Sequence, residues 1–173
     1  MSKRVLVLDT SVLCCWLRIP GKATAGLTDD PWNHDRIDQL LQAEQAQGST
    51  FVLPIASLIE TGNHIANSNG DRFALATVLS QYLRAAANSE TPWAAFSDQS
   101  SLWEEEGLSD LADTWPPLAA ASMSIGDATI KAVAEYYAVA GFHVQILTGD
   151  AGLKAYEPIQ PVSIPRRRTR SSS

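Results

Sequence analysis

Two acidic residues follow short apolar runs that suit buried strands. Asp9 comes directly after the run of residues 5–8, and Asp150 lies three residues beyond the run of residues 144–147. A continuous apolar run is typical of a parallel strand that is covered on both faces. Ligands of open parallel sheets bind beyond the carboxyl ends of the strands. We therefore predict that Asp9 and Asp150 lie at one edge of a sheet and share a ligand.

Two further acidic residues lie in predicted helices among apolar or small neighbours. Glu60 belongs to the segment 56–62, and Asp127 belongs to the segment 124–130. A carboxylate is costly to bury without a partner, and a shared divalent cation would remove that cost for all four groups together. Carboxylate oxygens are the ligands that Mg²⁺ and Mn²⁺ prefer. The four carboxylates are therefore predicted to form one site for a divalent cation.

Each of the four carboxylates also has a purely structural interpretation. Asp9 is a common N-cap type, and Asp127 would suit the positive end of a helix dipole. Glu60 would be an exposed residue of an amphipathic helix, and Asp150 a turn residue beside a glycine. The joint occurrence of the four favours a shared site. His64 lies four residues after Glu60, but without further ligands at a suitable spacing it is interpreted as structural.

The elements that must position these residues alternate between strands and helices. Strands are predicted over residues 5–8, 50–53 and 144–147, with shorter candidates over 93–96 and 159–164. Helices are predicted over residues 12–17, from Asp30-Pro31 to 47, from 54 to a turn at 67–71, and over 73–87, 99–113 and 125–140. Pro116 and Pro117 are expected to break the chain after the helix over 99–113. Strands alternating with helices favour βαβ units around a parallel sheet.

Composition limits the class of protein. The chain has 173 residues, of which 45% are hydrophobic, and this suits one domain with a sizeable core. The first apolar run breaks at Asp9, and no run reaches the roughly 18 apolar residues of a membrane span. We therefore expect neither a signal peptide nor a membrane span, and interpret the protein as cytoplasmic. The adjacent Cys14 and Cys15 cannot staple the fold and are interpreted as small apolar residues.

Charge is distributed unevenly along the chain, whose net charge is −6. Without the four arginines of the last eight residues, 9 Lys and Arg stand against 19 Asp and Glu. So acidic a body argues against a broad basic groove for nucleic acid. We predict that residues 165–173 form a disordered basic tail, and that its arginines contact RNA phosphates or an acidic partner: Arg166, Arg167, Arg168 and Arg170. The run Glu104–Glu106, with Asp110 and Asp113, is interpreted as a solvated face.

Four segments carry the acidic residues in a recognisable order. They are Val7-Leu-Asp-Thr-Ser-Val-Leu13, Leu58-Ile-Glu60, Gly126-Asp-Ala-Thr-Ile-Lys-Ala-Val-Ala134 and Ile146-Leu-Thr-Gly-Asp-Ala-Gly-Leu153. In order, spacing and predicted secondary structure they resemble the PIN domain family. The resemblance extends over residues 4 to about 157. The extra length around residues 20–33 and 88–123 departs from many toxin members and leaves substrate and partner open.

The resemblance implies a three-layer α/β/α, PIN-like domain over residues 1–164, with a central, mainly parallel sheet of four to five strands. It implies an RNA endonuclease that depends on Mg²⁺ or Mn²⁺ and is often the toxin of a bacterial toxin–antitoxin pair. The acidic positions of the family map onto Asp9, Glu60, Asp127 and Asp150, with Ser11 and Thr148 as polar helpers. Implied partners are an RNA substrate, an antitoxin protein and a second copy of the chain in a homodimer, and no membrane. The alternative function is a catalytically silent PIN-like module that binds RNA or a protein partner.

Overall fold

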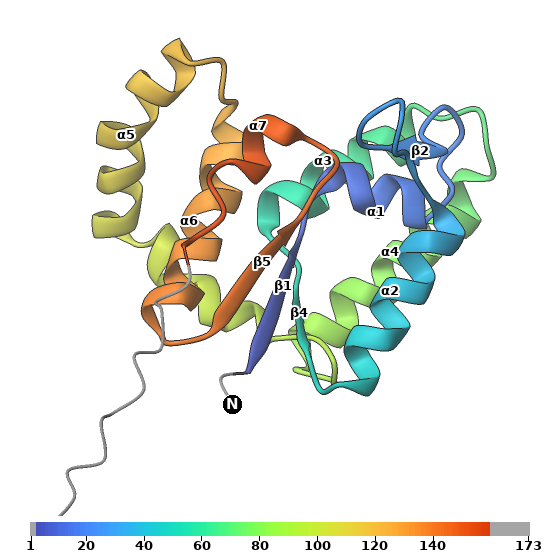
Figure 1. The fold of residues 1–173 in the computed structure, drawn as a ribbon, viewed down its shortest axis with the longest axis horizontal. Coiled ribbons are helices and arrows are strands. Elements are labelled where there is room, and N and C mark those ends of the chain that lie inside the picture. Colours follow the sequence, from blue (N-terminus) through green and yellow to red (C-terminus); the bar gives the residue numbers. More distant parts are fainter. Residues whose placement is uncertain (1–2, 160–173) are drawn as a thin grey trace, which may run out of the picture.

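A computed structural model describes residues 3–159 of the chain, which form an α/β fold with a parallel sheet at its centre (Figure 1). The elements are, in order, β1 (Arg4–Leu8), α1 (Thr10–Trp16), β2 (Thr24–Ala25), β3 (Trp32–Asn33), α2 (His34–Ala46), β4 (Thr50–Val52), α3 (Ile55–Ala66), α4 (Arg72–Ala87), the 3₁₀ helix η1 (Phe96–Trp103), α5 (Glu105–Ala120), α6 (Ile125–Val139), β5 (His143–Leu147) and α7 (Ala151–Lys154). Within residues 3–159, no helix combines the length and the apolar character needed to cross a membrane.

The parallel sheet has the strand order β4–β1–β5, so that β1 lies in the middle. Alternate residues of β1 enter different cores. Leu6 and Leu8 pack with residues of α1 and α2, whereas Val5 and Val7 pack with residues of α6. All four side chains are completely buried, which explains why the run is apolar without alternation. Helices on both faces make the fold compatible with a three-layer α/β/α arrangement.

Within residues 3–159 the parallel sheet has three strands, where four to five were expected for the whole domain. The predicted strand over residues 93–96 is reduced to one parallel bridge between Trp93 and Phe51. Phe96 already begins η1, so the chain turns away from the edge strand β4 before a strand can form. The aromatic and small residues over 93–96 resemble a strand locally, and the sequence alone does not indicate this turn.

The last predicted strand and the tail fall almost wholly outside the described residues. Of the predicted strand over 159–164, only Ile159 is described, and it is exposed and not part of a strand. The predicted basic tail, residues 165–173, lies beyond the described part of the chain.

Helix α2 begins later than the predicted start at Asp30-Pro31. The short strand β3 comes first, and Asn33 then caps the helix by accepting a hydrogen bond from the amide of Arg36 (2.9 Å). Asp30 pairs instead with the guanidinium group of Arg36, with 2.7 Å between Oδ1 and Nη1. The misplacement has a physical cause: strands β2 and β3 pair with each other in an antiparallel hairpin, and a hairpin of two-residue strands has no hydrophobic periodicity to reveal it.

Helix α5 continues through Pro116 and Pro117, where the sequence predicted a break. Each proline removes one hydrogen bond to the carbonyl four residues earlier. Those carbonyls belong to residues 112 and 113, which are exposed and can bond to water instead. Trp115 anchors the last turns, because its Nε1 atom donates to the carbonyl of Met123 (3.2 Å).

Two structural interpretations of the sequence are confirmed. Cys14 and Cys15 are buried in α1 and form no disulfide. The run Glu104–Glu106, together with Asp110 and Asp113, is exposed along α5 and the residue before it.

Candidate functional site

Asp9 lies at the carboxyl end of the central strand β1 and is only 5% exposed. It is the N-cap of α1, and its Oδ2 atom accepts three hydrogen bonds. The donors are the amide of Ser11 (3.3 Å), the Ser11 hydroxyl (2.6 Å) and the Thr148 hydroxyl (2.8 Å). The carboxylate is therefore held from the ends of both β1 and β5, while no described residue donates to its Oδ1 atom.

The same two hydroxyl groups tie the loop after β5 to the end of β1. Ser11 Oγ accepts a hydrogen bond from the amide of Gly149 (2.9 Å), and Thr148 Oγ1 accepts one from the amide of Asp150 (2.9 Å). A hydroxyl group can donate one hydrogen bond while it accepts another. Each of the two hydroxyls therefore links Asp9 to one amide of the loop, and together they set the position of Asp150 relative to Asp9.

Asp150 is exposed and caps α7. Its Oδ1 atom accepts hydrogen bonds from the amides of Gly152 (2.6 Å) and Leu153 (3.3 Å). Its Oδ2 atom has no donor among the described residues. Helix capping therefore uses only the Oδ1 atom of this carboxylate, and the Oδ2 atom remains available to a ligand.

Helices α3 and α6 bring Glu60 and Asp127 to the same side of the molecule. Glu60 Oε2 accepts a hydrogen bond from the hydroxyl of Thr10 (2.8 Å). Glu60 Oε1 faces α6 so closely that a Cβ atom on Gly126 would lie 3.0 Å from it. Asp127 Oδ2 accepts from the hydroxyl of Ser124 (2.8 Å), and the amide of Asp127 donates back to that hydroxyl (3.0 Å) at the start of α6.

The carboxyl group of Asp127 lies in the electrostatic field of the other three. Its pKa is raised above the ordinary value of 3.8, chiefly because burial removes water from the charged form. The hydrogen bond from Ser124 lowers the pKa, and the negative charges of Asp9, Asp150 and Glu60 raise it further. Coulombic effects of this kind weaken with distance, which agrees with the placement of the four carboxylates on the same side of the molecule, near the carboxyl end of β1.

The donor chemistry of the four groups suits a hard divalent cation. Each carboxylate keeps one oxygen without a donor among the described residues: Oδ1 of Asp9, Oε1 of Glu60, Oδ1 of Asp127 and Oδ2 of Asp150. No ion pair within residues 3–159 reaches any of them. Uncommitted carboxylate oxygens are the ligands that Mg²⁺ and Mn²⁺ prefer.

The four carboxylates are less closely arranged than a bound metal ion would require. In the described part of the chain, no group of three His, Cys, Asp or Glu side chains is arranged so that it could hold a metal ion. Binding by three or more of these carboxylates therefore requires side chains to rotate toward one another. His64 has no hydrogen bond or ion pair to Glu60 among the described contacts.

The neighbouring thiol offers no competing chemistry. Burial raises the pKa of Cys14 to about 11, with smaller upward contributions from the charges of Asp9 and Glu60. A thiol with this pKa is protonated at neutral pH and supplies neither a nucleophile nor a thiolate ligand.

Three residues of the site were missed by sequence reasoning: Thr10, Gly126 and Gly149. Thr10 had a usable signal, because it lies between Asp9 and Ser11. The two glycines had none, since their importance comes from what packs against them. Gly126 allows Glu60 to approach α6, and Gly149 is in contact with the β2–β3 hairpin.

A separate cavity of about 660 Å³ lies between α5 and α6. Its walls are largely apolar and include Leu111 and Leu118 of α5 and Tyr136 and Val139 of α6. None of the four carboxylates lines it. The cavity is therefore distinct from the carboxylate site.

The raised pKa of Asp127 predicts a pH dependence of stability in the metal-free protein. Above 3.8 and up to the raised pKa, the folded chain holds a proton that the unfolded chain has lost. The stability that this proton contributes is present at low pH and is lost as the pH rises through the raised pKa.

Asp127→Asn should remove this pH-dependent loss of stability. Because the group is partly solvated, we expect a difference of only about 1–2 °C in Tm. Thermal unfolding of both proteins in chelator, between about pH 4 and about pH 7, measures this difference in Tm. Parallel stability profiles would contradict the assignment to Asp127.

Comparison of the chain with models of protein families, with curated proteins and with solved structures found no match.

Proposed function

We propose that this protein is a PIN-like RNA endonuclease that hydrolyses phosphodiester bonds with Mg²⁺ or Mn²⁺ held by Asp9, Glu60, Asp127 and Asp150. The observation that supports the proposal is the placement of four carboxylates beside the carboxyl end of the central strand β1, each with one oxygen that accepts no hydrogen bond from a described residue. A bound divalent cation would activate a water molecule and neutralise charge on the phosphate. The choice of RNA as substrate, and a role as a toxin, rest on the family resemblance.

The protein's own residues would prepare the site in two ways. Ser11 and Thr148 hold Asp9 by its Oδ2 atom and leave Oδ1 without a donor among the described residues, so that it could accept a ligand. Asp127 takes up a proton more readily than an ordinary carboxyl group when no cation is present, and must release it when the carboxylate becomes a ligand. Four clustered carboxylates also repel the phosphate backbone of RNA. Substrate binding should therefore depend on prior neutralisation of the site.

Millimolar Mn²⁺ is expected to stabilise the metal-free protein. A ligand present at about 100 times its dissociation constant adds about 2.7 kcal/mol to the free energy of unfolding. For a chain of this size that corresponds to an increase of about 5–10 °C in Tm. Calorimetric titration in two buffers of different ionisation enthalpy should also show proton release from Asp127.

Cleavage of a mixed pool of single-stranded RNA with and without Mn²⁺ completes the test. Ca²⁺ is a suitable control, because it occupies oxygen sites with a different geometry and should stabilise without supporting the same rate. The absence of a thermal shift, of proton release and of cleavage with both Mg²⁺ and Mn²⁺ would overturn the proposal.

A second candidate function has its own support. The open arrangement of the carboxylates and the apolar cavity between α5 and α6 favour a catalytically silent module that binds a protein partner. Apolar cavities of this size are common binding sites. The two functions separate in the same experiment: the silent module predicts no Mn²⁺-dependent cleavage, whatever the effect of Mn²⁺ on Tm.

A further inference from the structure

The loop that carries Asp150 lies directly against the β2–β3 hairpin. A Cβ atom added at Gly149 would lie 2.4 Å from the amide nitrogen of Gly26 and 2.9 Å from Cβ of Ala25. These distances are far below van der Waals contact, and the nearest atom is backbone that cannot rotate away. Hairpin and loop therefore touch through backbone at a point where no side chain fits.

Backbone conformation does not explain the glycine at position 149. The glycines with positive φ angles among the described residues are Gly21, Gly26, Gly48 and Gly141. Gly149 adopts a conformation that other residues also adopt, so an L side chain is excluded by lack of space alone. The contact with the hairpin thus gives the reason for a glycine next to Asp150.

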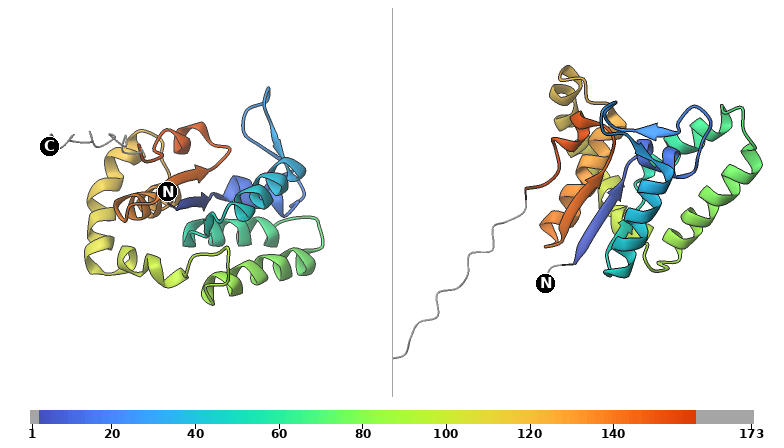
Figure 2. Two further views of the ribbon diagram at one scale, coloured as in Figure 1. Left: turned by 60° about the horizontal axis from the view of Figure 1, so that its bottom comes forward. Right: turned by 45° about the vertical axis from the view of Figure 1, so that its right-hand side comes forward.

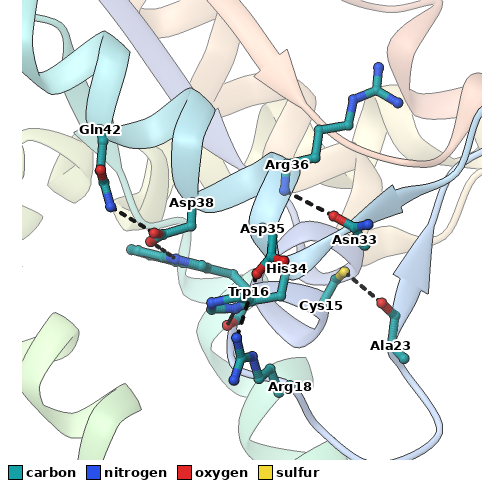
Figure 3. A network of polar contacts seen from close by, with 10 residues as sticks. All are labelled: Cys15, Trp16, Arg18, Ala23, Asn33, His34, Asp35, Arg36, Asp38 and Gln42. Atoms are coloured by element: carbon teal, nitrogen blue, oxygen red, sulfur yellow. Dashed lines mark hydrogen bonds and ion pairs between the residues drawn. The ribbon is translucent and has the colours of Figure 1, made fainter.

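The hairpin is anchored firmly at its other side (Figure 3). The buried thiol of Cys15 donates to the carbonyl of Ala23 (3.2 Å) just before β2, and lies 3.6 Å from the carbonyl of Trp32 in β3. After β3, His34 Nδ1 lies 2.6 Å from the carbonyl of Trp16. The base of the hairpin is thus fixed to the end of α1, and Figure 2 shows the hairpin beyond the carboxyl ends of the strands.

The loop is consequently held between two supports. On one side the amide of Gly149 donates to Ser11, which also holds Asp9. On the other side Gly149 abuts Gly26 of the hairpin. We infer that the β2–β3 hairpin is a brace that sets the position of the Asp150 carboxylate relative to Asp9, with Gly26 and Gly149 as positioning residues. The link to metal binding rests on the proposed function, whereas the mechanical part does not.

The brace can be tested first without any metal. Gly26→Ala places a methyl group 3.1 Å from Trp32 Cδ1 at a φ angle of 88° and should displace the hairpin. Gly21→Ala is the matched control, because its φ angle of 81° brings similar strain while nothing lies within 4 Å of the added Cβ atom. Gly149→Ala disturbs the same contact from the side of the loop.

Amide hydrogen exchange reports the result. The amides of Gly152 and Leu153, which donate to Asp150, should exchange about tenfold faster in Gly26→Ala and Gly149→Ala, but within about threefold of wild type in Gly21→Ala. Equal exchange in Gly26→Ala and Gly21→Ala, at equal Tm, would overturn the brace. If Gly26→Ala does not fold, comparison of the amide exchange rates of Gly149→Ala and Gly21→Ala decides the same question.

A Mn²⁺ titration then tests the link to the site. Gly26→Ala should weaken Mn²⁺ binding by about tenfold, as the loss of other outer supports of metal ligands does. In an Asp150→Asn background the same substitution should have no further effect, because the brace acts through that carboxylate. A full tenfold loss in both backgrounds would overturn the positioning role. Absence of Mn²⁺ binding by the wild type would instead refute the proposed function, and the exchange experiment would still decide the brace.

Discussion

Asp9→Asn is expected to abolish the Mn²⁺-dependent increase in Tm and to weaken Mn²⁺ binding by at least about 100-fold, since even outer supports of metal ligands contribute about 10- to 100-fold. Asp9 is the central and most buried of the four carboxylates, and its Oδ1 atom is uncommitted. Asparagine retains the shape and an acceptor oxygen for Ser11 and Thr148 but loses the charge. Metal-dependent RNA cleavage should be lost together with binding.

The metal-free stability of Asp9→Asn should change little or increase, because one of four mutually repelling charges is removed. Asp71→Asn is the matched control: Asp71 caps α4 with its side chain on the amide of Ala74 (3.0 Å), as Asp9 caps α1. Differential scanning fluorimetry with and without Mn²⁺ compares the two variants. If Asp9→Asn retained the Mn²⁺-dependent increase in Tm, Asp9 would be a helix cap and not a metal ligand.

Thr148→Val is expected to weaken Mn²⁺ binding by about 10- to 100-fold, the second largest effect. The Thr148 hydroxyl donates to Asp9 and accepts from the amide of Asp150, so it supports two carboxylates at once. Valine keeps the volume and branching of threonine but leaves the amide of Asp150 and one lone pair of Asp9 without this partner. Loss of the partly buried hydrogen bond to Asp9 costs about 1–3 kcal/mol, whereas water can replace the partner of the exposed Asp150 amide, so Tm should also fall.

Thr148→Ser separates the hydroxyl from the methyl group. It restores both hydrogen bonds and should recover most of the Mn²⁺ affinity lost in Thr148→Val. Calorimetric titration of the three proteins at one pH gives the comparison. Equal Mn²⁺ affinity of Thr148→Val and wild type, at lowered Tm, would show that the hydroxyl serves the fold and not the site.

The local signals in the sequence were sufficient for the framework of the fold. The apolar runs ending at Leu8 and Leu147 are the central and outer strands β1 and β5, with Asp9 and Asp150 just beyond them. The helical periodicity and the terminal Gly141 placed α6 within one residue of its observed end at Val139. These features were readable because burial pattern and capping depend on residues that are close in the sequence.

The weaker predictions failed where distant packing outweighed local preference. A run of aromatic and small residues after Pro92 became a single bridge, because the chain turns into η1. Two prolines did not end α5, because residues 112 and 113, whose carbonyls lose a helical partner, are exposed to solvent. The hairpin of β2 and β3 replaced a predicted loop and helix start, because α1 and α2 support strands too short to be recognised alone.

From the sequence by itself came the identity of the four acidic residues, their order and their places beside strands and helix starts. Their mutual arrangement depended on the folded chain. Ser11 and Gly149 are 138 positions apart, yet one hydrogen bond between them joins the two strand ends. The approach of Glu60 to Gly126, and of the hairpin to Gly149, likewise comes from packing between elements. Such contacts leave no periodic trace in a single sequence, because each glycine is selected by the space that a distant backbone leaves to it.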